Sequence, residues 1–254
     1  MAKNWAIAVG INHYSSLTPL NYAQRDAERI KQLLLSEVGF DQVFLFTNDS
    51  PEIPAKPTPI CTQPTFGHLR QFLRRQFNRK ILSEGDNLWF FFAGHGRREA
   101  NRDYLMLCDS DPGDVCSTAI PVHYITEQLR SSGAGNVVLL LDACRNQGAR
   151  GEGIGEEHRG VVTFYSCAPN QKAYEIEALQ QGAFTYALIE ALKIQGAGNC
   201  ATVERLEQYL QRRVPELNRQ YPQNQGRQTP YAIPEPTIDT PSPETRDSSF
   251  NQRT

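Results

Sequence analysis

The 254-residue sequence lacks CxxC pairs, lacks an apolar run long enough to cross a membrane, and lacks a large excess of either charge. Its six cysteines are spread along the chain, which excludes a zinc site with paired cysteines and a dense disulfide scaffold. The formal net charge of −2 gives no electrostatic reason to bind nucleic acid or an anionic membrane. The first residues, MAKNWAIAVGIN, contain one lysine and an apolar run shorter than a signal peptide requires. We therefore expect a cytoplasmic protein with reduced thiols, no membrane contact and no nucleic-acid partner.

Apolar runs bounded by turn residues predict buried strands, and segments with helical apolar spacing separate them. The expected strands cover residues 5–11, 43–46, 86–93, 137–141 and 160–167, with a hairpin piece at 104–108 and a last strand at 231–233. The expected helices cover residues 21–38, 65–82, 121–130, 183–194 and 202–214, with Asn21 as a cap and Gly39 as a stop. This alternation predicts an α/β fold with a mainly parallel sheet. We expect one domain over residues 1–235 and a disordered tail or linker over 236–254, which is rich in Pro, Ser, Thr and charge.

Reactive side chains follow two of the predicted strands. The apolar run 137–141 leads into Asp142 and Cys144, and the strand 86–93 breaks at Gly94-His95-Gly96. Ligands of open α/β sheets bind at the carboxyl ends of the strands, so two neighbouring ends would bring His95 and Cys144 together. A cysteine needs such a base to become a thiolate, and a glycine on each side would keep the ring uncrowded. Alone, either residue is more simply a structural histidine or a buried cysteine, but the two together favour catalysis.

The segments FFFAGHGR and LLLDACRNQG resemble the caspase-like cysteine peptidases, nearest to the bacterial branch related to metacaspases, often called orthocaspases. The 49-residue separation of His95 and Cys144 is close to the roughly 50 residues of caspases. Two further segments, WAIAVGINHYSSLTPLNYAQRDA and GVVTFYSCAPNQKAYEIEALQQGAFTYALIEAL, extend the resemblance to residues 3–235. It implies a three-layer sandwich with helices on both faces of the sheet. It also implies that Cys144 attacks a peptide carbonyl, that His95 is the acid and base, and that the backbone N–H groups of Cys144 and Gly96 hold the oxyanion.

The resemblance further implies a basic residue before the cut. The metacaspase-like branch uses two carboxylates for this purpose, and Asp26 and Asp142 match them; Asp142 stands where caspases have Gln. Paired acids in a cleft bind a guanidinium through charge-assisted hydrogen bonds. The alternative for Asp26 is an exposed acid in the first turn of a helix, where it favours the helix dipole. The expected partners are therefore proteins or peptides with Arg or Lys before the scissile bond.

Some features depart from that pattern. Asp109, Asp111 and Asp114 form an acidic cluster, but calcium needs six to eight oxygens, so we read an ordinary turn and expect no required cofactor or metal. Many metacaspases have a second cysteine where this chain has Ala23, so we expect no reserve nucleophile. The basic face of the helix at 65–82 is interpreted as solvated.

The sequence favours three functions to different degrees. The first is an Arg- or Lys-specific cysteine endopeptidase, monomeric and able to cut itself at Arg150 or Arg159 in the glycine-rich stretch. The second is a catalytically silent caspase-like module that only binds partners. The third, a nucleotide-binding domain, is disfavoured because GEGIGE lacks the spacing of a phosphate loop.

Overall fold

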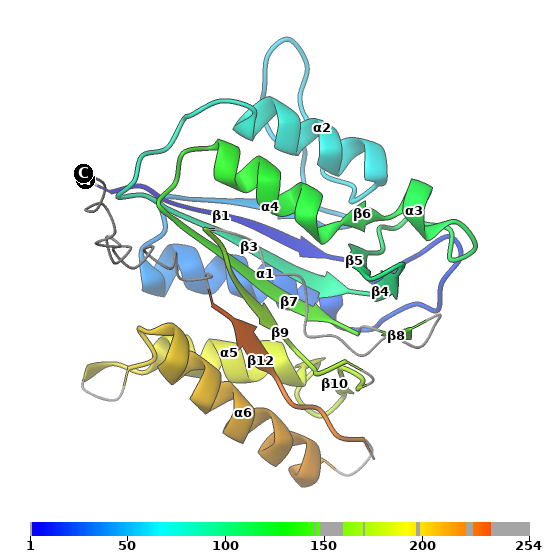
Figure 1. The fold of residues 1–254 in the computed structure, drawn as a ribbon, viewed down its shortest axis with the longest axis vertical. Helices are drawn as coiled ribbons and strands as arrows, with labels where there is room; N and C mark the ends of the chain where they lie inside the picture. The colour runs from blue at the N-terminus through cyan, green and yellow to red at the C-terminus, as the bar shows by residue number, and fades with distance from the viewer. Residues whose placement is uncertain are drawn as a thin grey trace, which may run out of the picture.

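A six-stranded sheet forms the centre of the protein in the computed structural model, which describes residues 2–144, 146–147, 160–169, 171–196, 199–221 and 226–234 (Figure 1). The strand order is β12-β9-β7-β3-β1-β2. Strands β1, β2, β3, β7 and β9 run parallel, and β12 pairs antiparallel with β9. Their bounds are β1 Asn4–Gly10, β2 Gln42–Phe46, β3 Asn87–Gly94, β7 Asn136–Ala143, β9 Val162–Tyr165 and β12 Tyr231–Ile233. The predicted α/β class with a mainly parallel sheet is confirmed.

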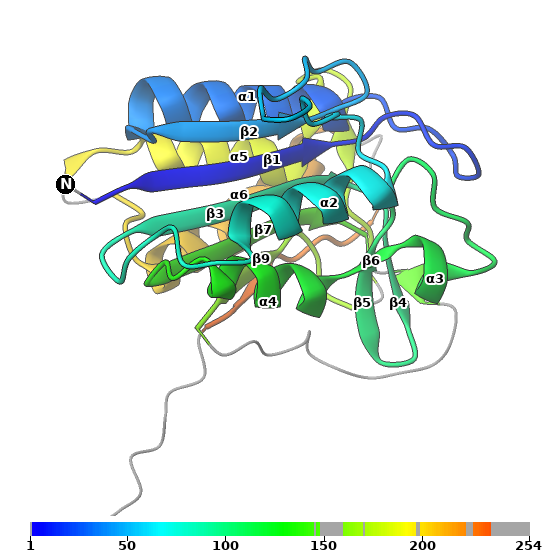
Figure 2. The same ribbon diagram turned by 90° about the horizontal axis from the view of Figure 1, so that it is seen from above.

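Helices cover both faces of this sheet, which gives three layers (Figures 1 and 2). One face carries α1 (Ala23–Leu33), α5 (Ala183–Lys193) and α6 (Val203–Gln220), and the other carries α2 (Phe66–Phe77) and α4 (Val122–Ser131). The side chains of each central strand are divided between two buried clusters. Phe90 and Phe92 pack towards α2 and α4, whereas Phe91 packs towards α1 and α5. Burial on both faces explains why these strands are continuous apolar runs without polar alternation.

Helix α1 begins differently from the prediction. Asn21 does not cap it; the N-cap position is Tyr22, whose side chain makes no capping hydrogen bond. The free N–H groups are satisfied from outside the helix, because Asn12 Oδ1 accepts from Gln24 N–H at 2.9 Å and Glu175 Oε1 accepts from Tyr22 N–H at 2.7 Å. The predicted stop is confirmed: the helix runs on into a π-helical turn, η1 (Leu34–Val38), and Gly39 follows with a left-handed φ of 86°.

A second, four-stranded sheet lies beyond the carboxyl ends of β3 and β7 (Figure 2). Its order is β6-β5-β4-β8, and β4 and β5 form the antiparallel hairpin that the sequence indicates near residues 104–108. The bounds are β4 Gly96–Glu99, β5 Arg102–Leu105, β6 Ile120–Pro121 and β8 Asn146–Gln147. The short helix α3 (Val115–Thr118) precedes β6. A separate two-stranded sheet pairs β10 (Glu175–Ile176) with β11 (Gln181–Gly182).

Among the described residues, no helix is both long enough and apolar enough to cross a bilayer. The expected tail at 236–254 lies outside the described residues, so that expectation stays a prediction.

Candidate active site

His95 and Cys144 each lie between a strand of the central sheet and a strand of the second sheet. Before them, Gly94 pairs with Ala143 in the parallel ladder of β3 and β7. After them, Arg97 pairs with Asn146 in the parallel ladder of β4 and β8. Both pairs have the same separation as His95 and Cys144, 49 residues, so the two residues occupy equivalent places in neighbouring chain segments. Neighbouring strands lie about 4.8 Å apart, which brings the two backbones side by side at the carboxyl edge of the sheet.

The glycines that flank His95 allow close packing of other parts of the protein. A Cβ at Gly94 would lie 2.6 Å from the Tyr14 hydroxyl, and a Cβ at Gly96 would lie 2.5 Å from the carbonyl oxygen of Cys144. This role differs from the predicted one, which was to keep the imidazole uncrowded. Gly94 makes room for a tyrosine, and Gly96 makes room for the backbone of the cysteine itself.

Four interactions fix His95. Its N–H donates to Tyr14 Oη at 2.9 Å, its carbonyl accepts from Met106 N–H at 2.9 Å, and its ring centroid lies 4.8 Å from that of Tyr14. Its Nε2 lies 2.7 Å from the carbonyl oxygen of Thr18, which can only accept, so Nε2 carries the proton. In neutral histidine the other ring nitrogen, Nδ1, is then free to take a proton.

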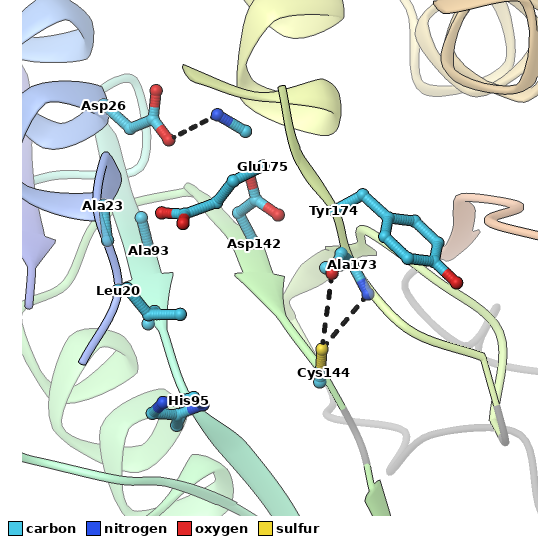
Figure 3. Close-up of a pocket in the computed structure, with 12 residues that line it drawn as sticks. Leu20, Ala23, Asp26, Ala93, His95, Asp142, Cys144, Ala173, Tyr174 and Glu175 are labelled. Atoms are coloured by element: carbon cyan, nitrogen blue, oxygen red, sulfur yellow. Dashed lines mark hydrogen bonds between the residues drawn. The ribbon is translucent and has the colours of Figure 1, made fainter. Parts of the chain in front are cut away.

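The thiol of Cys144 is turned towards the segment before β10. Its Sγ accepts from Ala173 N–H at 3.1 Å and lies 3.7 Å from Ala173 O (Figure 3). Burial raises the pKa of Cys144, and the Ala173 N–H opposes the shift. Among the hydrogen bonds of the described residues, none joins Sγ to the imidazole of His95. The sulfur and the ring border one pocket but do not form an ion pair in this structure.

Three acidic side chains line that pocket: Asp26 from α1, Asp142 from β7 and Glu175 from β10 (Figure 3). Asp26 accepts from Gly182 N–H at 2.9 Å and from Gln181 Nε2 at 3.2 Å. Asp26 is 2% exposed, so the alternative of an exposed first-turn acid is wrong. The described residues that line the pocket include no lysine or arginine. The lining therefore suits a cation.

The two aspartates converge on one point. A Cβ at Gly182 would lie 2.5 Å from Asp142 Oδ2 and 3.1 Å from Asp26 Oδ2. Burial raises the pKa of Asp26 well above its usual range, and repulsion from Asp142 adds to it. Burial also raises the pKa of Asp142 to about 6, against hydrogen bonds from the Thr185 hydroxyl at 2.6 Å and the Thr185 N–H at 3.2 Å. A cation in the pocket would stabilise both ionised forms.

Glu175 is the acid that the sequence did not reveal. Its carboxylate accepts from the N–H groups of Asn21 and Tyr22, so it ties the β10 segment to the start of α1. No spacing rule points to it, because the fold alone brings β10 to α1.

The three aspartates near residue 110 accept hydrogen bonds from the backbone of a turn and of two helix starts. Asp109, Asp111 and Asp114 accept backbone N–H groups of Phe66, Gly113 and Ser117. Within the described ranges, no three metal-binding side chains gather into a site. Arg150 and Arg159 lie outside the described residues, so their expected role as self-cleavage sites stays a prediction.

Comparisons with known proteins identify the family of this chain. The caspase-domain family of peptidases, C14, matches residues 3–235. A probable protease of a Desulfuromonadales bacterium is 27% identical over 223 residues, which cover 78% of this chain and 26% of that protein. Metacaspase-9 of Arabidopsis thaliana is 32% identical over 98 residues, 38% of this chain and 28% of that protein. Each match therefore spans about a quarter of the length of the relative.

A crystal structure shares the fold. It is a Geobacter sulfurreducens protein with a TM-score of 0.63 and 16% identity, and the match covers 92% of this chain and 95% of that one.

Proposed function

The chain belongs to the caspase-domain family of cysteine peptidases, and we propose that it is an endopeptidase that cleaves after arginine or lysine by means of Cys144 and His95. The observation that carries this proposal is the pocket that both residues border, which Asp26, Asp142 and Glu175 line. A guanidinium or ammonium group in that pocket would form charge-assisted hydrogen bonds with the carboxylates. It would also place the following peptide bond beside the sulfur.

In the proposed reaction, Cys144 Sγ gives its proton to His95 and attacks the scissile carbonyl carbon. A carbon–sulfur bond forms as the carbon–nitrogen bond breaks, and His95 returns the proton to the departing amine. The backbone N–H groups of Cys144 and Gly96 would hold the oxyanion. Water then attacks the thioester, gives a proton to His95 and releases the acid product. The proton on Nε2, held by Thr18 O, supports a role for Nδ1 in these transfers.

The contact between Cys144 and Ala173 has to change during the reaction. Sγ would leave the Ala173 N–H and turn towards His95 when a substrate backbone enters the cleft. The raised pKa of Cys144 describes the thiol before that step.

The same contact is the observation that favours the second candidate, a silent module. In a silent module, the sulfur would remain satisfied by Ala173 and would never reach His95. The natural partners of such a module would be proteins that bind without being cut.

Turnover of fluorogenic peptides separates the two. We expect hydrolysis after Arg and Lys but not after Asp, complete loss with Cys144→Ala, and unchanged rates with Cys116→Ala, which removes an exposed cysteine. No turnover of any peptide would favour the silent module. Turnover after Asp would overturn the role of the acidic pocket.

Self-processing is a finer part of the proposal. If the peptidase cuts itself after Arg150 or Arg159, the variant with Arg150→Ala and Arg159→Ala stays intact, as does Cys144→Ala. Unchanged fragmentation of the double variant, with an intact Cys144→Ala chain, would place the cut elsewhere.

A further inference from the structure

Tyr14 contacts both the backbone and the ring of His95. It lies in the segment between β1 and α1, and its ring packs against the imidazole at 4.8 Å with an interplanar angle of 52°. Its hydroxyl oxygen accepts the His95 N–H at 2.9 Å. The absence of a side chain at Gly94 makes room for that oxygen, because a Cβ there would lie 2.6 Å from it. The ring contact, the backbone hydrogen bond and the space left by Gly94 therefore all involve Tyr14.

The segment that carries Tyr14 also carries the carbonyl that orients the ring. Thr18 O lies 2.7 Å from Nε2 of His95. Two backbone hydrogen bonds hold the segment. The Ser15 N–H donates to Cys108 O at 2.8 Å, and the Leu20 N–H donates to Asn12 O at 2.9 Å, which closes the segment into a loop. A shift of Tyr14 would thus move the ring contact, the backbone contact and the Thr18 carbonyl together.

The hydroxyl of Tyr14 does not reach the reacting atoms. Its oxygen is engaged by the backbone N–H of His95, and Tyr14 is absent from the described residues that line the pocket. Burial raises the pKa of Tyr14, so the group stays protonated and neutral at physiological pH. It is therefore suited to hold another residue in place rather than to transfer a proton.

From these contacts we infer that Tyr14 is a positioning residue, which holds the imidazole of His95 where it can protonate the leaving amine. The inference rests on the proposed peptidase function. It predicts that loss of the Tyr14 hydroxyl slows the protonation of the leaving amine by His95. Proton transfer depends on a placement within a few tenths of an ångström, whereas substrate binding in the acidic pocket does not involve Tyr14.

Two substrates with the same arginine isolate that step. Cleavage of a peptidyl-arginine amide needs a proton on the departing amine. Cleavage of the matching p-nitrophenyl ester does not, because p-nitrophenolate leaves unprotonated. Both substrates need His95 to take the thiol proton, but the amide alone also needs it to protonate the leaving group. A defect in the position of His95 should therefore slow acylation by the amide more than acylation by the ester.

The test is Tyr14→Phe, which keeps the ring and removes the acceptor of the His95 N–H. We expect kcat/KM for the amide, which reports acylation, to fall about 10-fold, kcat/KM for the ester to fall clearly less, by about 2- to 3-fold, and KM for the amide to stay within about 2-fold. Tyr209→Phe on α6 is the matched control and should change none of these values. Equal losses on both substrates, or no loss on either, would overturn the inference.

A second variant covers a failure of Tyr14→Phe to fold. Gly94→Ala keeps the tyrosine but places a Cβ 2.6 Å from its hydroxyl and 2.8 Å from the Phe92 ring. Because it displaces the hydroxyl from the His95 N–H, it should also slow the amide more than the ester. If both variants fail to fold, Tyr14 has a structural role only and the inference is wrong. If the unaltered protein cleaves neither substrate, the proposed function fails, and this outcome is distinct from an active protein that is insensitive to Tyr14.

Discussion

Replacement of Asp142 by asparagine should stabilise the protein while it damages the pocket. Asp142 is 8% exposed, and its Oδ2 accepts two hydrogen bonds from Thr185. An asparagine oxygen can accept both of these bonds. The substitution therefore removes a buried charge beside Asp26 without removing the acceptor, and the protein no longer has to hold an ionised group that burial destabilises.

The pKa of Asp142 gives the size of the effect. Burial raises this pKa to about 6, roughly two units above the ordinary value, and each unit corresponds to about 1.4 kcal/mol. Ionised Asp142 thus lowers the free energy of unfolding by about 3 kcal/mol above pH 7, which is the upper limit of the gain for Asp142→Asn. For a chain of this size that limit corresponds to a rise in Tm of about 6–12 °C.

The sign of the pH dependence follows from the raised pKa. Folded Asp142 takes up its proton near pH 6 and the unfolded chain does so near pH 4, so the destabilisation is complete above pH 6 and fades as the pH falls from 6 to 4. The advantage of Asp142→Asn should therefore be present at pH 8 and largely gone at pH 4.

The assay is urea unfolding of the unaltered protein and of Asp142→Asn at both pH values. Glu127→Gln, which changes an exposed acid of α4, is the control and should alter stability by less than about 0.5 kcal/mol. In parallel, kcat/KM for an arginine substrate should fall about 10- to 100-fold, since a hydrogen bond to a charged group contributes about 1.5–3 kcal/mol. A destabilised variant at pH 8, or a gain that does not depend on pH, would refute the reasoning.

Four other predictions concern the site and its support. Because burial raises the pKa of Asp142 to about 6, kcat/KM for arginine peptides should fall as the pH drops through 6. This fall should be smaller in Asp142→Asn, in which Asp26 still has a raised pKa; initial rates between pH 5 and 8 test it. Gly182→Ala should raise KM about 10-fold with kcat little changed, because the new Cβ would displace the carboxylates of Asp142 and Asp26; a KM within twofold of normal contradicts this. Tyr165→Phe should lower the free energy of unfolding by about 1–2 kcal/mol in urea, since it removes the 3.2 Å hydrogen bond to the buried Asp103; an unchanged midpoint speaks against that bond. We expect activity to be the same with and without a chelator, and a loss that calcium restores would show a metal requirement.

The main features of the fold could be predicted from the sequence because its strands are buried on both faces. Continuous apolar runs marked every strand of the central sheet, and the shared 49-residue separation is the register of two parallel ladders. The ends of helices and strands were harder to predict than their existence. Helix α6 runs to Gln220, past Pro215 and the predicted end at residue 214, since Leu217 in its last turns is buried. Tertiary packing there outweighs the local effect of the proline.

The parts of the site that the sequence did not indicate come from loops. Glu175 reaches the pocket through the β10–β11 pairing, and Ala173 reaches Cys144 from the same segment. Tyr14 meets His95 from 81 residues away in the chain. These residues belong to no periodic segment and have no spacing rule, so only the folded arrangement brings them to the site. The prediction of Asn21 as the cap of α1 was wrong for the same reason. The groups that accept the first N–H groups of this helix, on Asn12 and Glu175, lie outside the helix and follow no local pattern.

Covalent labelling by a peptidyl-arginine chloromethyl ketone tests the central claim most directly. The claim is that Cys144 lies within reach of a peptide whose basic side chain occupies the acidic pocket. Intact and peptide mass spectrometry should find one label per chain, on Cys144, with no reaction of the other five cysteines. The matching aspartyl reagent should react far more slowly, and Asp142→Asn should reduce the difference. Labelling at a different cysteine, or equal rates with the arginyl and aspartyl reagents, would contradict the claim.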